Sequence, residues 1–215
     1  LDLRERLRIG DGRTAGPTGF SLFDDDVEAS LRDLVTIMLT ISDNAATDAL
    51  IARVRLERIQ ERLAGLGLDG TVIPFDLRGM FELGERMLDP RHSIVTTARD
   101  MARLLRLVWR DEAAPAAACA AVRWVMARQL TRHRLASGFE HGVTVSAKSG
   151  GLFGVWRNEV GVVEFPEGRR FAAAVFTRAH VPYARDNDIN HAIGTAAATA
   201  IRTMRDTQPP TTLGD

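Results

Sequence analysis

The chain has 215 residues, a length typical of one globular domain with a sizeable core. Apolar residues make up 45% and charged residues 26%, the balance of a soluble globular protein and not of a disordered or membrane protein. The formal net charge is zero, so neither nucleic acid nor an anionic membrane surface is indicated as a partner. The sequence contains no apolar run long enough to span a bilayer and no signal-peptide pattern.

The first two thirds of the chain predict helices. Residues 1–27 are polar and turn-rich, which indicates a loop with at most a short strand. Residues 28–140 are mainly helical in pattern, and Ser30 and Thr97 are placed to cap two of the helices. Residues 70–96 hold prolines and glycines and are expected to be mostly irregular. A connection of that length inside a compact domain usually serves an active site.

The last third of the chain changes from helical to alternating periodicity. Strands are predicted over 143–149, 155–165 and 170–177, with a hairpin at 166–169. A final helix then completes the segment 141–206, and 207–215 reads as a tail. Helices, then an antiparallel meander, then a helix predict an α+β fold, with 1–215 as one domain.

Lys148 is the only lysine in a chain that otherwise uses arginine for positive charge. Lysine is a compact charge whose pKa moves readily, whereas arginine keeps its proton, so a lone lysine suggests a role that arginine cannot fill. Lys148 lies in a predicted strand that ends at Gly150-Gly151 in a tight turn. Taken alone, the segment slightly favours an ordinary lysine at a sheet edge beside a turn.

The tripeptide Ser42-Asp43-Asn44 separates two predicted helices. Its hydroxyl, carboxylate and amide could project into a cleft, but the same three residue types are the preferred N-caps of helices. Followed about a hundred residues later by Lys148-Ser149-Gly150, the tripeptide resembles the S-D-N and K-[ST]-G motifs of class A β-lactamases and penicillin-binding proteins. The run Thr96 to Ala102 resembles the helix that follows the active-site loop in that family, so the resemblance extends over essentially the whole chain.

The resemblance implies a serine hydrolase that opens a β-lactam amide through an acyl-serine intermediate, without cofactor or metal. It implies that Ser42 relays a proton to the leaving nitrogen and that Lys148 supplies positive potential. The backbone N–H of Gly151 would be an oxyanion donor. The expected substrate-binding residues are Asn44, Ser149, Gly150 and Arg157. The partner implied is a small-molecule β-lactam or a related amide or ester, and the family implies an exported protein.

Two departures from the family pattern matter. The family's S-x-x-K is absent, because Val145 stands three residues before the only lysine. The resemblance therefore implies a β-lactamase-like domain that lacks the N-terminal helix, the first two strands and the nucleophile helix. In the active-site loop, Met80 stands where the family's deacylating glutamate would be, which leaves Glu82 and Glu85 as candidate bases.

Two other functions stay open at this point. One is a D-alanyl peptidase, penicillin-binding protein or esterase with slow deacylation, which Met80 favours. The other is a non-catalytic domain that uses the same cleft to bind or sense a ligand. The five histidines are scattered without metal-like spacing, so no metal site is predicted. The sequence does not specify the natural substrate or the oligomeric state.

Overall fold

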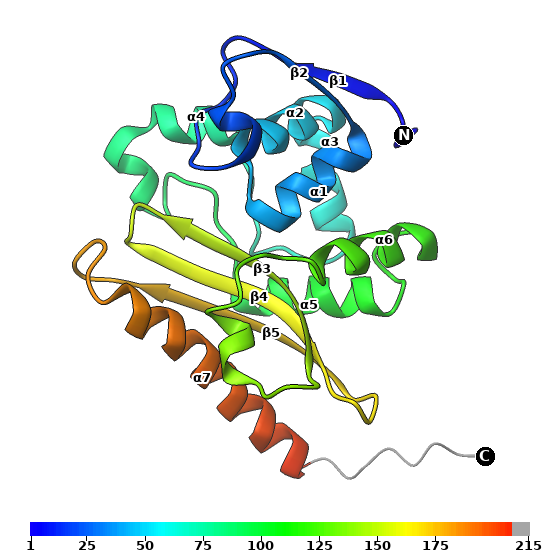
Figure 1. Ribbon diagram of the computed structural model, residues 1–215, viewed down its shortest axis with the longest axis vertical. Coiled ribbons are helices and arrows are strands. Elements are labelled where there is room, and N and C mark those ends of the chain that lie inside the picture. The colour runs from blue at the N-terminus through cyan, green and yellow to red at the C-terminus, as the bar shows by residue number, and fades with distance from the viewer. Residues whose placement is uncertain (208–215) are drawn as a thin grey trace.

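The computed structural model describes residues 1–207 and has the helical and strand elements labelled in Figure 1. In chain order these are β1 (Arg6–Ile9), η1 (Gly19–Leu22), β2 (Val27–Ser30), α1 (Leu31–Ile41), α2 (Asn44–Val54), α3 (Leu56–Gly65), α4 (Leu77–Glu82), η2 (Gly84–Leu88), α5 (Ala98–Trp109), α6 (Ala116–Met126), η3 (Leu135–Gly138), β3 (Thr144–Leu152), β4 (Trp156–Glu164), β5 (Arg170–Arg178) and α7 (Asp186–Thr207). The α+β prediction is confirmed. Of the predicted tail 207–215, all but Thr207 lies outside the described residues.

The central sheet is antiparallel in the order β3-β4-β5. The long helix α7 and the short η3 cover one face, while α5 and α6 lie against the other (Figure 1). Because side chains alternate along a strand, neighbouring valines serve different layers. Val163 packs with Ile201 of α7, and Val162 packs with Leu105 of α5. Both faces of β4 are therefore core.

Glycines allow α7 and η3 to pack closely over the sheet. A Cβ on Gly138 would lie 2.1 Å from the carbonyl oxygen of Gly194. Any larger residue at position 138 would therefore push η3 away from α7. In β4, a Cβ on Gly161 would lie 2.8 Å from the Leu135 side chain. This close packing brings the segment before η3 onto the sheet beside Lys148-Ser149-Gly150.

The helical part forms as the capping pattern predicts. The Ser30 hydroxyl accepts a hydrogen bond from the N–H of Asp33, and Thr97 does the same for Asp100, which confirms both caps. Leu34 and Ala46 are fully buried where α1 packs against α2. Together α1 to α4 form the layer that faces the free edge of β3 (Figure 1).

The short strand allowed for the start of the chain is β1, which pairs with β2 in a separate two-stranded sheet. The segment 70–96, expected to be mostly irregular, contains the short helices α4 and η2. The predicted end of the Lys148 strand was wrong: β3 continues through Gly150-Gly151 to Leu152, because both glycines pair with β4, and the turn follows at 153–155.

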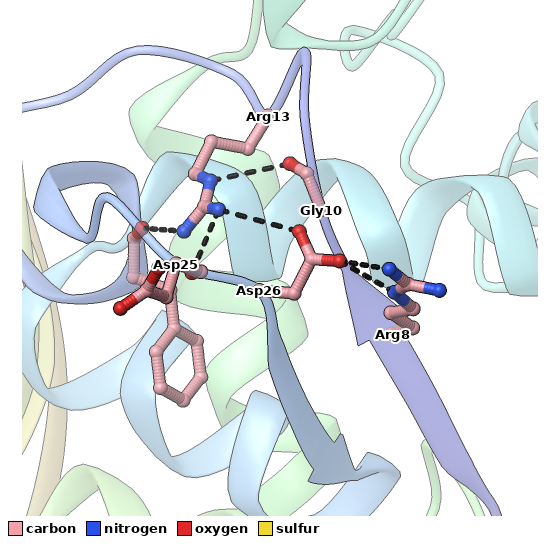
Figure 2. A network of polar contacts seen from close by, with 6 residues as sticks. Arg8, Gly10, Arg13, Asp25 and Asp26 are labelled. Carbon is pink, nitrogen blue, oxygen red and sulfur yellow. Dashed lines mark hydrogen bonds and ion pairs between the residues drawn. The ribbon is translucent and has the colours of Figure 1, made fainter.

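An arginine network organises the connection between β1 and β2 (Figure 2). Arg13 donates to the carbonyl oxygens of Gly10 and Asp25, at 3.2 and 2.8 Å, and its guanidinium lies 3.8 Å from the Asp26 carboxylate. Asp26 also pairs with Arg8 of β1. The network closes the loop that carries residues 15–18 to the edge of the candidate site.

Candidate active site

A cavity of about 950 Å³ lies between the helical layer and the free edge of β3. Residues from the loop after β1, the α1–α2 junction, α4 and β3 line it. Six of the residues singled out from the sequence are among them: Ser42, Asn44, Lys148, Ser149, Gly150 and Gly151. The two motifs therefore meet at one site although they lie about a hundred residues apart.

At the α1–α2 junction, Asp43 has a structural role, whereas Ser42 and Asn44 line the cavity. Asp43 is the N-cap of α2: its fully buried carboxylate accepts from the N–H groups of Ala46 and Ser21, at 2.6 and 3.1 Å. Ser42 ends α1 in the left-handed region at φ 62°, a conformation that costs a non-glycine residue about 1–2 kcal/mol. This backbone turns the Ser42 hydroxyl toward the cavity. The capping interpretation holds for Asp43, and Ser42 is left available for chemistry.

Lys148 joins the two halves of the site. Its ammonium donates to the hydroxyl of Ser42 at 3.0 Å and to the carbonyl oxygen of Ser149 at 2.5 Å. Burial lowers the pKa of Lys148 to about 8, while the charge of Glu159 opposes that shift and the charge of Arg134 adds to it. The group therefore changes charge close to neutral pH, as the lone lysine suggested.

Asn44 begins α2 at the cavity wall. Its side-chain N–H₂ donates to the carbonyl oxygen of Ala15 at 2.7 Å, so the amide nitrogen holds the preceding loop in place. Because an amide carries both donors and an acceptor, the carbonyl oxygen of the side chain is left to face other groups.

The outer edge of β3 presents backbone N–H groups to the cavity. Ser149 donates its N–H to the side-chain oxygen of Gln129 at 2.7 Å, which shows that this N–H points away from β4. Backbone directions repeat every second residue along a strand, so the N–H of Gly151 points to the same side. The N–H of Ser149 is thus already paired with Gln129, and the N–H of Gly151 is the next outward-pointing donor on this edge.

Arg134, and not the predicted Arg157, is the arginine that lines the cavity. Arg157 does not line the cavity: it is 4% exposed and pairs with Asp186 at the start of α7. Arg134 takes the place beside β3. It donates to the carbonyl oxygen of Gly150 at 2.7 Å and to the side-chain oxygen of Asn190 at 2.9 Å, and it lines the cavity. No local pattern marks Arg134 in an arginine-rich sequence, because its position depends on the packing of η3.

The loop side of the cavity is apolar. Met80 is buried and lines the cavity together with Phe81, whose ring lies 6.4 Å from that of Phe153 in an edge-to-face arrangement. Glu82 and Glu85 are exposed and do not line the cavity. The structure therefore does not bring either candidate base to the site.

Within residues 1–207 no group of three or more histidine, cysteine or acidic side chains is arranged to hold a metal ion. No helix in the same range has the length and apolarity to cross a membrane.

An S-D-N turn facing a K-S-G strand across a cavity, between a helical layer and an antiparallel sheet, defines a serine hydrolase fold of the β-lactamase type. Residues 1–204 match the model of the Beta-lactamase enzyme family. The chain belongs to this family, and the resemblance drawn from its two motifs is confirmed.

The individual relatives found share less than a third of their residues with this chain. The "Beta-lactamase regulatory protein BlaB" of Streptomyces cacaoi is 29% identical over 223 residues, covering 85% of this chain and 71% of the relative. Among solved structures, a β-lactamase from Sphaerobacter thermophilus has a TM-score of 0.81 and 26% identity, covering 96% of this chain and 76% of that protein. A point mutant of PBP-A, solved as an acyl-enzyme complex with penicillin-G, has a TM-score of 0.80 at 22% identity, covering 94% and 74%. The likeness to PBP-A shows the fold alone.

Proposed function

We propose that the cavity binds a carboxylate-bearing β-lactam or a related amide or ester, and that in this family member it serves acyl transfer through a serine ester. The observation that carries the proposal is the 3.0 Å contact between Lys148 and Ser42 across the cavity. That contact joins the only lysine of the chain, with its lowered pKa, to a hydroxyl held toward the same space.

In the proposed reaction, Ser42 relays a proton toward the leaving nitrogen, and Lys148 biases this relay. The backbone N–H of Gly151 donates to the developing oxyanion, a contribution worth about 3 kcal/mol in other acyl transfers. The substrate carboxylate binds between Lys148 and Arg134, with Ser149 at its side. The covalent step also needs a nucleophile of the S-x-x-K type, which has no counterpart in the printed sequence.

Slow deacylation is the expected behaviour of such a site. The loop-side wall of the cavity carries Met80 and Phe81, and the two candidate bases, Glu82 and Glu85, are exposed and do not line it. A general base must lie within hydrogen-bond reach of the water that it activates. We therefore place peptidase-like, esterase-like or penicillin-binding behaviour ahead of rapid β-lactam hydrolysis.

A regulatory role is the second candidate. The relative from Streptomyces cacaoi is described as a regulatory protein. Binding without turnover needs only the cations and the strand edge that line the cavity, and no nucleophile. In this alternative the same cavity binds the β-lactam, and the bound state is the signal.

Both candidates are tested with benzylpenicillin. Because the chain has one lysine, labelling with ¹³C-lysine gives a single NMR signal that reports on the cavity. We expect this signal to shift saturably with benzylpenicillin and much less with its neutral methyl ester. Because acylation needs an S-x-x-K serine, intact-mass spectrometry separates the chemistries when it is done on a protein that also contains that segment, with the 215-residue chain as the control. Product without adduct indicates a β-lactamase, a lasting adduct indicates a penicillin-binding protein, and binding with neither indicates the regulatory role. No shift at millimolar penicillin would overturn the proposal.

A further inference from the structure

Glu159 is a buried carboxylate in the middle of the sheet. It lies in β4 and is 1% exposed, in a strand that continues as Val160-Gly161-Val162-Val163. One carboxylate oxygen accepts from the side-chain N–H₂ of Gln129 at 2.8 Å, and the other accepts from the backbone N–H of Leu135. A buried carboxylate costs several kcal/mol unless other groups compensate it, so its presence requires an explanation.

The first of these hydrogen bonds leads to the K-S-G segment. Gln129 is 4% exposed, and its side-chain oxygen accepts from the N–H of Ser149. Because a backbone N–H only donates, the oxygen of Gln129 must face Ser149 and the nitrogen must face Glu159. The nitrogen then needs an acceptor, which a carboxylate provides. Glu159, Gln129 and Ser149 thus form one oriented chain that ends beside Lys148.

The second hydrogen bond leads to Arg134. The N–H that reaches Glu159 belongs to Leu135, the next residue in the chain, and Gly161 leaves room for Leu135 to lie on β4. From this anchor the Arg134 guanidinium extends to the carbonyl oxygens of Gly150 and Asn158, at 2.7 and 3.0 Å. The same carboxylate therefore holds the backbone beside both cations of the cavity.

The charges agree with the geometry. Burial raises the pKa of Glu159, while the N–H of Leu135, the charge of Arg134, the amide of Gln129 and the charge of Lys148 all lower it. The charges of Lys148, on the neighbouring strand β3, and of Arg134, just before η3, both act on this carboxylate. Arg157, on β4 itself, acts on Arg134.

We propose that Glu159 is a positioning residue that fixes Lys148-Ser149 and Arg134 around the anion-binding end of the cavity, through Gln129 and Leu135. That this end of the cavity binds an anion rests on the proposed function, but the positioning of the two cations by Glu159 can be tested without any ligand. The competing explanation is that Glu159 only anchors the 129–135 segment and has no effect on the cations.

The test uses the single ¹³C-lysine signal, titrated with pH in the free protein. Glu159→Gln keeps the size of the side chain and removes its charge, so the pKa of Lys148 should move further below about 8. Glu159→Asp, which keeps the charge, should restore most of the shift. The matched control is Glu164→Gln, on the same strand but in an ion pair with Arg170, which should leave Lys148 unchanged. A folded Glu159→Gln protein with an unchanged Lys148 titration would overturn the proposal.

A second measurement keeps the proposal testable if Glu159→Gln does not fold. Gln129→Met has a similar shape but removes the acceptor of the Ser149 N–H. Amide hydrogen exchange at Ser149 should become about tenfold faster, the change expected from the loss of one hydrogen bond. Unchanged exchange would show that the chain from Glu159 does not hold the edge of β3. Because neither measurement needs a ligand, failure of penicillin binding alone leaves this inference intact.

Discussion

Lys148 donates a hydrogen bond to Ser42, a residue 106 positions earlier in the chain, across the cavity between the sheet and the helices. The lysine comes from the edge strand β3 and the serine from a helix end in the left-handed conformation, so the contact joins the sheet to the helical layer. A titratable group at such a junction makes both binding and stability depend on pH.

Binding of benzylpenicillin should weaken as Lys148 loses its proton. With the pKa of Lys148 at about 8, the ammonium is mostly charged at pH 7 and mostly neutral at about pH 9.5. The affinity for the carboxylate should fall by about tenfold across this range, the loss expected for one partly screened ion pair. Calorimetric titration at several pH values measures it, and the neutral methyl ester is the control. An affinity that stays constant to about pH 10 would contradict the assigned charge.

Protein stability should change with pH in the opposite direction. The pKa of Lys148 falls from 10.5 to about 8 on folding. Between these values the unfolded chain holds a proton that the folded chain has released, so stability rises with pH through this window. Lys148→Met should be more stable than the parent by about 1–3 kcal/mol at pH 7, and this difference should shrink by about pH 10. Urea unfolding of both proteins measures the two curves, and parallel curves would refute the prediction.

The two arginines should separate binding from stability. Arg134 lines the cavity, whereas Arg157 is buried against Asp186. Arg134→Gln should weaken benzylpenicillin binding by more than about tenfold with a modest effect on folding. Arg157→Gln leaves a carboxylate without its cation and should mainly destabilise the protein, by about 1–3 kcal/mol. Benzylpenicillin binding and urea unfolding, measured for both variants, show which arginine contributes to binding and which to stability. The reverse pattern would return the substrate-binding role to Arg157.

Most of the helices and strands could be predicted from the sequence, because they depend on local patterns. Ser30, Asp43 and Thr97 cap helices where their residue types favour it, and the strands alternate as expected. The junction at Ser42 and the strand at Lys148 could be paired only through the resemblance of the two motifs, since no local rule joins segments so far apart.

The remaining site residues could not be predicted, because tertiary packing decides them. Arg134 reaches the cavity only because η3 lies on the sheet, and that position depends on glycines in three elements. Glu159 carried one usable signal, since an acidic residue among valines is unusual in a buried strand. Its partner Gln129 carried none.

Loss of the Asp43 carboxylate should destabilise the junction strongly. Asp43 is fully buried and accepts from two backbone N–H groups, those of Ala46 and Ser21. Asp43→Ala should cost about 2–4 kcal/mol, because the cap is lost and one buried and one half-buried N–H are left unpaired. Ser30→Ala, which removes an exposed cap on one N–H, is the control and should cost about 1 kcal/mol. Equal losses in thermal or urea unfolding would show that Asp43 acts only as an ordinary cap.

The contact of α7 with η3 should control the cavity from a distance. Gly138→Ala places a methyl group 2.1 Å from the backbone oxygen of Gly194, where no side chain can move aside. We expect a loss of about 3 kcal/mol and a displaced η3, as for other overpacked contacts. The control Gly65→Ala, in a helix with nothing within 4 Å, should gain about 0.5–1 kcal/mol. Arg134 directly precedes η3, and the position of η3 sets its hydrogen bonds to Asn190 and Gly150. Benzylpenicillin affinity should therefore fall in Gly138→Ala and stay unchanged in Gly65→Ala. Unaltered affinity in a folded Gly138→Ala protein would show that the position of Arg134 does not depend on this contact.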